Sequence, residues 1–118
     1  MNKGSDIKFL QKKIRKFVND RDWMQFHNHK DMAISLVLEA TELLEHFQWK
    51  SAKEVEERAR THKEEITDEI ADIAIYLLEL TENLDIDICN AILSKLKKNS
   101  QKYPVKKSRG SHKKYNEL

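Results

Sequence analysis

The stretch EEITDEIADIAIYLLEL, residues 64–80, decides the fold class of this 118-residue chain. Four of its apolar residues recur at helical spacing and form one stripe: Ile66, Ile70, Ile73 and Leu77. Ile75 and Leu78 lie on the opposite side, so the predicted helix is apolar nearly all round. Such a helix is buried on two sides. Because the chain is short, we expect a second subunit to supply the second covering surface.

The whole sequence predicts an all-α bundle of four to five helices, completed by oligomerisation. It contains two Gly and one Pro, and 36% of its residues are charged, a composition that favours helices with solvated faces. A first helix is expected from an N-cap at Ser5 or Asp6 to about residue 19. After a polar connection, further helices are expected over about residues 32–49 and 88–102, the last ending before Pro104.

Short polar motifs predict where other helices begin and end. Residues 51–54, SAKE, have the form of a capping box and should begin a helical segment that continues to about residue 83. That segment is either one long helix or two helices with a bend near His62. Residues 84–87, LDID, are typical of a turn, with one of two aspartates as the next N-cap: Asp85 or Asp87.

Composition also bears on compartment and domain organisation. Cys89 is the only cysteine, so an intrachain disulfide cannot form. No apolar run reaches the ~18 residues of a membrane span, and the first residues lack the pattern of a secretory signal. We therefore expect a cytoplasmic protein without a membrane partner. Its predicted organisation is one all-α domain over residues 1–105 and a basic tail over residues 106–118.

Three glutamates interrupt the apolar pattern of residues 35–49, SLVLEATELLEHFQW. At ~100° per residue, Glu39 borders the apolar stripe, Glu42 lies roughly 60° further round the helix, and Glu45 roughly another 60°. Neither Lys nor Arg follows any of them at i+4, where a surface helix usually gains from one. The missing partners suggest that something else neutralises the cluster.

Residues 64–80 contain a second acidic pair, Glu69 and Asp72, along one flank of the apolar stripe. A rival pair, Glu65 and Asp68, lies one turn earlier in less apolar surroundings. If the two acidic flanks face each other, four carboxylates meet, and oxygen ligands suit Mg²⁺ or Mn²⁺. A solvated acidic flank is the other interpretation, and the spacing leaves both open. A di-iron bundle would need Glu-x-x-His motifs, which do not accompany the cluster on these two helices.

Three segments, taken in order, resemble those of a known family. They are RDWMQFHNHKDMAISLVLEATELLEHFQWK (residues 21–50), DEIADIAIYLLEL (residues 68–80) and SKLKKNSQKYPV (residues 94–105). The sequence is similar to the all-α nucleoside triphosphate pyrophosphatases of the MazG-like superfamily, and within it to the dCTP pyrophosphatase branch. The resemblance covers about residues 17–105 and implies the fold of that superfamily.

The same resemblance implies roles for individual residues. Four carboxylates would bind Mg²⁺: Glu39, Glu42, Glu69 and Asp72. A carboxylate that is not fully used in coordination can orient the attacking water, and we expect Glu42 or Glu45 to be this catalytic residue. Six residues would contact the base, sugar or phosphates of the substrate: Trp23, His27, Trp49, Tyr76, Lys95 and Asn99. Structural alternatives stay open for them, including a Trp49 ring in the core, a His27 that caps the next helix, and a Tyr76 in a dimer core.

The activity implied by the resemblance is hydrolysis of a nucleoside triphosphate between its α and β phosphates, in a homodimer or homotetramer. A preference for dCTP or a modified pyrimidine nucleotide, and a role in cleaning the nucleotide pool, are the implied refinements. A non-enzymatic helical module that binds nucleotides or nucleic acid through the basic tail is the alternative. The acidic cluster argues against nucleic acid as the partner. An inactive helical adaptor is a third interpretation, against which the four carboxylates argue.

Overall fold

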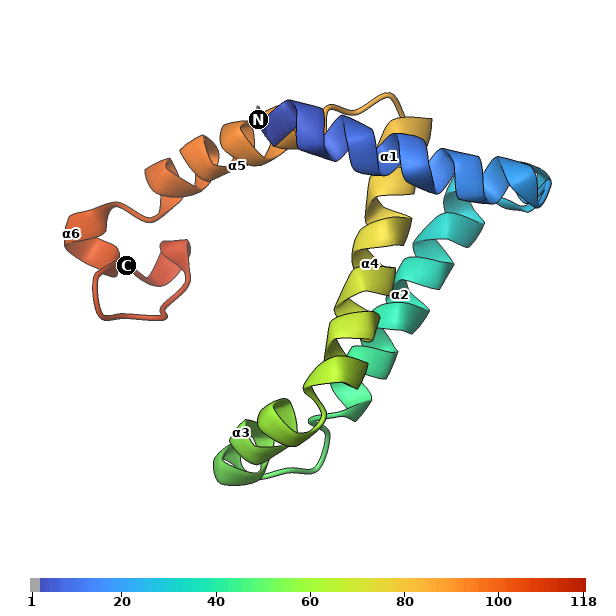
Figure 1. Cartoon of the computed structure of the whole chain (residues 1–118). Coiled ribbons are helices and arrows are strands. Elements are labelled where there is room, and N and C mark those ends of the chain that lie inside the picture. Colours follow the sequence, from blue (N-terminus) through green and yellow to red (C-terminus); the bar gives the residue numbers. More distant parts are fainter. Residues whose placement is uncertain (1–2) are drawn as a thin grey trace. The chain divides into compact units, whose positions relative to one another are not determined.

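The described part of the chain is built from helices, as the sequence predicts (Figure 1). The computed structural model describes the backbone of residues 3–118 and the side chains from residue 6 onward. Within this range there is no strand, and the elements are α1 (Lys3–Asp20), η1 (Met24–Phe26), α2 (His29–Glu45), α3 (Ala52–Thr61), α4 (Lys63–Asn83), α5 (Ile88–Lys102), α6 (Val105–Ser108) and η2 (Tyr115–Glu117). No helix between residues 3 and 118 combines the length and apolar character that crossing a lipid bilayer requires.

Contacts divide the chain into two compact units, one ending at Asp85 and the other beginning at Ile86. In the first unit, α2 and α4 lie side by side and run in opposite directions, with α1 across one end of α4 and α3 at the other (Figure 1). Helix α4 therefore contacts three helices, which agrees with its nearly all-round apolar character. The predicted domain boundary at residue 105 stays a prediction.

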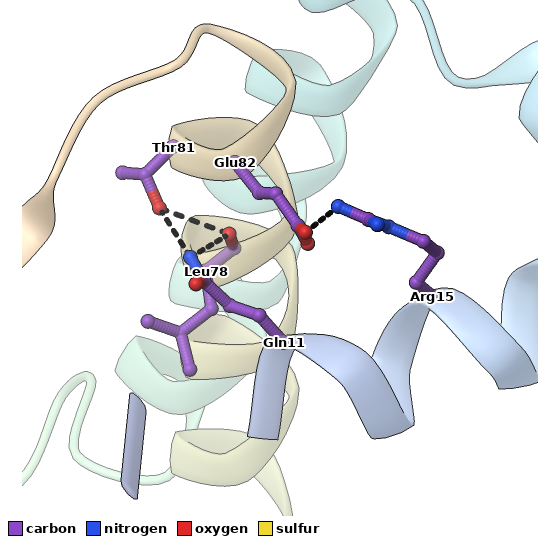
Figure 2. A network of polar contacts seen from close by, with 5 residues as sticks. All are labelled: Gln11, Arg15, Leu78, Thr81 and Glu82. Atoms are coloured by element: carbon purple, nitrogen blue, oxygen red, sulfur yellow. Dashed lines mark hydrogen bonds and ion pairs between the residues drawn. The ribbon is translucent and has the colours of Figure 1, made fainter. Parts of the chain in front are cut away.

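Polar contacts hold α1 on the C-terminal half of α4 (Figure 2). The Gln11 side-chain amide donates to the carbonyl of Leu78 at 3.0 Å and lies 3.4 Å from the hydroxyl of Thr81. Arg15 forms an ion pair with Glu82. The side chains of α1 and α4 are thereby held in one register, because an amide and a guanidinium each need their partner at a particular place along α4.

Two of the predicted helix boundaries rest on local hydrogen bonds that the structure contains. The Ser51 hydroxyl accepts from the backbone N–H of Glu54 at 3.3 Å, and the Glu54 carboxylate accepts from the backbone N–H of Ser51 at 3.1 Å. This capping box begins α3. The helical segment is interrupted at His62, so residues 52–83 form two helices and not one. Asp87 is the N-cap of α5 and accepts from the backbone N–H of Asn90 at 3.1 Å.

The prediction for α2 was wrong at both ends. The helix begins at His29, three residues before the predicted start, because the Asn28 side chain accepts from the backbone N–H of Asp31 at 2.9 Å and caps it. It ends at Glu45, and the turns that follow lead to Trp49 with φ +65°. Trp49 is thus in the left-handed region, outside the helix in which the sequence placed it.

The two ends of the chain also differ from prediction. Helix α1 begins at Lys3, so Asp6 lies within its first turn and is not its N-cap, and the Ser5 side chain lies outside the described residues. The basic tail forms α6 and η2. The Tyr115 ring there packs edge-on against the Tyr103 ring, with 6.2 Å between the two centroids. The Lys102 ammonium lies 4.9 Å from the centroid of the Tyr115 ring. These contacts give the tail a local structure that its composition did not predict.

Few of the side chains from residue 6 onward are fully buried. The buried apolar residues are Val18, Met32 and Ile66. Ile70 and Leu77, predicted for the same stripe as Ile66, are 53% and 38% exposed. Exposed apolar residues continue along both central helices: Ile34, Val37, Leu38 and Leu44 on α2, and Ile75 on α4. Apolar surface gathered in this way is typical of a face that another surface covers.

Candidate metal centre and nucleotide site

Three of the predicted metal ligands meet between α2 and α4. One carboxylate oxygen each from Glu39, Glu69 and Asp72 lies within 4.8 Å of the other two. The spacing of three residues puts Glu69 and Asp72 on one face of α4, and the packing of α2 along α4 brings Glu39 opposite them. The two acidic flanks therefore face each other, while metal binding by these residues stays a prediction.

Glu42 and Glu45 lie on the same side of α2 as this group. The Glu42 carboxylate lies close enough to Glu39 and Glu69 to raise the pKa of both. It also lines a cavity of about 270 Å³, whose other lining residues are Glu45, His46, Arg58 and Glu69. The two residues predicted to orient water thus border the cavity next to the acidic group, and their catalytic role stays a prediction.

The electrostatics of the acidic group suit a cation. Partial burial and the contact with Glu42 raise the pKa of Glu39 to about 6, and repulsion from Asp72 and Glu69 acts in the same direction. Partial burial and Glu42 also raise the pKa of Glu69. Among the side chains that the structure describes, the Oε2 atoms of Glu39 and Glu69 are buried and have no hydrogen-bond partner. Unpartnered carboxylate oxygens held close together fit a hard divalent cation such as Mg²⁺.

We expect the affinity for Mg²⁺ to rise with pH up to about 6 and then to level off. The pKa of Glu39 is about 6 in the metal-free chain, and its proton must leave before the carboxylate can bind a cation. Below that pH, each displaced proton should cost up to about tenfold in affinity per pH unit. Calorimetric titration with Mg²⁺, in buffers of different ionisation enthalpy, measures both the affinity and the proton release. The exposed Asp68 provides the control, since Asp68→Asn should leave the profile unchanged; a flat profile between about pH 5 and 6 would contradict the prediction.

Tyr76 is half-buried beside the acidic group. Burial, and then the proximity of Glu39 and Asp72, raise the pKa of its hydroxyl, although a hydrogen bond with Ser35 acts in the opposite direction. The hydroxyl therefore stays protonated at neutral pH and is available as a donor at the edge of the site. Its contact with substrate stays a prediction.

Trp23 and His27 form a second cluster, in the connection between α1 and α2. The Trp23 ring packs edge-on against Phe17 at 5.8 Å between centroids and lies 6.4 Å from the His27 ring. Nδ1 of His27 is 2.8 Å from the carboxylate of Glu79. Glu79 is buried, with 4% of the whole residue exposed. The alternative that His27 caps α2 is wrong, because Asn28 does so. Neither Trp23 nor His27 lines the acidic cavity.

The other predicted substrate residues lie outside α2 and α4, the helices that carry the acidic group. Trp49 is 92% exposed, which overturns the alternative that its ring lies in the core. Lys95 and Asn99 lie on α5 in the second unit, where Lys95 is exposed and Asn99 half-buried. The backbone carbonyl of Asn99 accepts from the N–H of Tyr103 at 2.8 Å. The substrate roles of these three residues stay predictions.

Three buried or half-buried polar residues were not predicted from the sequence to belong to these clusters. Glu79 pairs with His27 across 52 positions of the chain. His46 and Arg58 line the acidic cavity and contact each other. The position of His46, four residues after Glu42, indicated that it lies on the same side of the helix. No spacing rule predicts the contact of Arg58 with His46 or that of Glu79 with His27.

The sequence is similar to those of known proteins. Residues 34–118 match the MazG-like family. The chain is 42% identical over 104 residues to dCTP pyrophosphatase 1 of Rattus norvegicus and 38% identical over 104 residues to that of Homo sapiens. Each alignment covers 86% of this chain and 61% of the relative, so the chain spans about three fifths of the length of these curated relatives.

A solved structure extends the likeness to three dimensions. The crystal structure of a pyrophosphatase from Archaeoglobus fulgidus is 39% identical in sequence, with a TM-score of 0.81. The match covers 84% of this chain and 93% of that one. At this identity and coverage the likeness concerns the family as well as the fold.

Proposed function

This chain belongs to the MazG-like family, and we propose from that premise that it is a Mg²⁺-dependent nucleoside triphosphate pyrophosphohydrolase. The observation that carries the proposal is the group of Glu39, Glu69 and Asp72, whose oxygens lie within 4.8 Å of one another. Two of these residues have buried carboxylate oxygens without a hydrogen-bond partner in the described structure. Such a group is expensive to assemble without a cation.

The proposed mechanism assigns the carboxylates two tasks. Glu39, Glu69 and Asp72, together with Glu42, hold Mg²⁺, which supplies electrostatic stabilisation of the phosphate charge when bound. Glu45 or Glu42 accepts a proton from a water molecule at the cavity wall. The water oxygen forms a bond to the α-phosphorus while the bond from that phosphorus to the bridging oxygen breaks. The electron pair leaves with pyrophosphate, and the nucleoside monophosphate remains.

A preference for dCTP or a modified pyrimidine deoxynucleotide is the proposed specificity. It is supported by the similarity to proteins named dCTP pyrophosphatase 1. The proposed contacts to base, sugar and phosphates come from Trp23, His27, Trp49, Tyr76, Lys95 and Asn99. Exposed aromatic rings can stack on a base and contribute roughly 1–3 kcal/mol, and Trp49 is 92% exposed. Clearing unwanted nucleotides in the cytoplasm is the proposed role.

A panel of nucleoside triphosphates tests the proposed activity. With Mg²⁺, the chain should release pyrophosphate and no orthophosphate, fastest from dCTP or a modified pyrimidine deoxynucleotide. Asp68→Asn, which changes an exposed acid one turn from Asp72, should keep the activity. The absence of pyrophosphate release from every nucleotide, together with salt-sensitive binding of DNA, would favour the non-enzymatic binding module instead.

We also propose that the chain forms a homodimer or homotetramer, through the exposed apolar faces of α2 and α4. Val37→Lys tests the α2 face, because Val37 is 64% exposed in the single chain. If a second copy covers it, the buried ammonium should weaken association by roughly 2–4 kcal/mol. If nothing covers it, Lys is the better helix former and the change should be neutral or slightly stabilising.

Light scattering coupled to gel filtration measures the outcome for Val37→Lys over a range of protein concentrations. Glu56→Ala, which changes the charge by the same single unit on an exposed position of α3, should leave the oligomer intact. A wild-type chain that stays monomeric, or a Val37→Lys oligomer of unchanged affinity, would contradict the proposed interface.

A further inference from the structure

Arg58 is the one arginine among the residues that line the acidic cavity. It lies in the last turn of α3 and is half-buried. The other lining residues are Glu42, Glu45, His46 and Glu69. A guanidinium in such surroundings would usually form an ion pair with the nearest carboxylate. The salt bridges of the described side chains include none from Arg58.

His46 holds the guanidinium instead. Nε and one terminal nitrogen of Arg58 lie 3.3 and 3.2 Å from Nδ1 of His46. His46 is 8% exposed, so its ring is confined by the packing of α2 against its neighbours. Since Nδ1 accepts from Arg58, it carries no proton in this arrangement. One edge of the guanidinium is used in this contact, and its remaining N–H groups are available to a ligand in the cavity.

The combination of charges in this cavity suits a phosphate that arrives with a cation. Once a divalent cation neutralises the carboxylates, the arginine is left as a positive group without an anionic partner. The planar fork of a guanidinium matches the oxygens of a phosphate and can bind two of them. During hydrolysis of the anhydride, negative charge accumulates on the leaving pyrophosphate, so a cation placed there stabilises the transition state more than the bound substrate.

We propose that Arg58 binds the pyrophosphate portion of the nucleoside triphosphate, and that His46 positions its guanidinium for this contact. The assignment rests on the proposed pyrophosphohydrolase function. It adds to the carboxylate group a residue from α3, a helix that carries none of the site residues predicted from the sequence. In this arrangement α3 forms one wall of the site, and its Arg58 supplies a positive charge opposite the carboxylates.

Arg58→Ala tests the assignment directly. It should lower kcat/KM for the best nucleotide roughly 10- to 100-fold, the range expected for a lost charged hydrogen bond. It should weaken inhibition by inorganic pyrophosphate roughly tenfold or more and leave inhibition by the nucleoside monophosphate unchanged. Arg58→Lys, which keeps the charge but not the fork, should lie between wild type and Arg58→Ala. Circular dichroism establishes that each variant is folded.

Arg60→Ala is the matched control, because Arg60 lies two residues away, has a 74% exposed side chain and only a loose contact with Glu57 at 3.8 Å. It should leave kcat/KM and pyrophosphate inhibition unchanged. Equal losses of pyrophosphate and monophosphate inhibition in Arg58→Ala, or no loss of either, would overturn the assignment. An equal loss in Arg60→Ala would overturn it as well, since a general charge effect would then explain both.

The positioning role of His46 is tested by a double-mutant cycle. His46→Leu removes the acceptor of the guanidinium and should weaken pyrophosphate inhibition, whereas His46→Asn, whose side-chain oxygen can accept in its place, should restore part of it. His46→Leu should add little to Arg58→Ala, because both act through one contact. Fully additive effects would overturn the positioning role.

Calorimetry with Mg²⁺ and pyrophosphate separates this inference from the proposed function. If the wild-type chain hydrolyses no nucleotide but binds magnesium pyrophosphate in an Arg58-dependent manner, the proposed function fails and the anion site stands. If the wild type hydrolyses nucleotides and Arg58→Ala behaves like wild type, the function stands and the anion site is overturned. If the wild type neither hydrolyses nucleotides nor binds pyrophosphate, both are overturned.

Discussion

Glu39→Gln is expected to reduce pyrophosphate release by about 10³-fold or more. The substitution keeps the size of the side chain but removes a negative oxygen from the group formed with Glu69 and Asp72. An amide is a poor substitute for a carboxylate toward a hard cation, and loss of the cation would remove several kcal/mol of transition-state stabilisation. At 1.36 kcal/mol per tenfold in rate, about 4 kcal/mol corresponds to the expected decrease. Steady-state assays at saturating Mg²⁺, with Asp72→Asn as a second ligand variant, measure it.

The same variant should be more stable than wild type in metal-free buffer. The folded-state pKa of Glu39 is raised from 4.5 to about 6, so the folded chain binds a proton that the unfolded chain releases more readily. The stability of the wild type should therefore fall as pH rises from below 4.5 through about 6, and Glu39→Gln should lack this part of the decrease. Urea unfolding at several pH values, in the presence of a chelator, measures the difference.

Asp68→Asn is the control for both effects of Glu39→Gln. Asp68 is exposed and belongs to the rival acidic pair, so its replacement should change neither the activity nor the pH dependence of unfolding. A Glu39→Gln chain with more than about a tenth of wild-type activity would exclude Glu39 as a metal ligand. A variant that is inactive and also less stable at neutral pH would point to a structural role for Glu39 instead.

The second large effect is expected at the buried pair of His27 and Glu79. Their side chains are 17% and 5% exposed, and Nδ1 of His27 is 2.8 Å from the carboxylate. His27→Leu leaves the Glu79 carboxylate buried without its partner, which should cost roughly 3–5 kcal/mol of unfolding free energy. His27→Leu combined with Glu79→Leu removes both polar groups and should recover most of this loss. Chemical unfolding at one fixed protein concentration compares the variants, since an oligomer's stability depends on concentration.

Glu57→Ala provides the control for this pair. Glu57 and Arg60 form an exposed ion pair, with side chains 65% and 74% exposed and 3.8 Å between them. Its loss should change the free energy of unfolding by less than about 1 kcal/mol. If the single and the double variants at positions 27 and 79 were equally destabilised, packing rather than an unpaired buried charge would explain the loss.

Where the sequence predicted structure correctly, the deciding interactions are local. The capping box of Ser51 and Glu54 was predicted outright, whereas the bend at His62 and the cap at Asp87 were each one of two alternatives, and all three involve residues within one helical turn. The start of α2 was missed although Asn28 and Asp31 have the same local form. The many polar residues around Asn28 are typical of a connection between helices and concealed the cap. Helix ends are decided by small differences in free energy, so such errors are expected there.

The residues of the candidate site also differ in whether local spacing in the sequence could reveal them. The spacing of Glu69 and Asp72, and the missing basic partner of Glu39, left a metal site and a solvated acidic flank both open. The structure brings those three residues together. Arg58 could not be found in this way. It reaches the cavity because α3 packs against α4, and the angle of such a short helix depends on packing.

By itself, the sequence determined the all-α class, the helical periodicity and the acidic pairs, because each depends on residues three or four positions apart. Only the tertiary structure decided which charges become partners over longer distances: His27 with Glu79, Arg15 with Glu82, and Arg58 with His46. It also decided that Trp49 is exposed in a left-handed turn and that Val37 is exposed in the single chain. Burial and long-range pairing follow from how whole helices pack, and the same helical pattern is compatible with several packings.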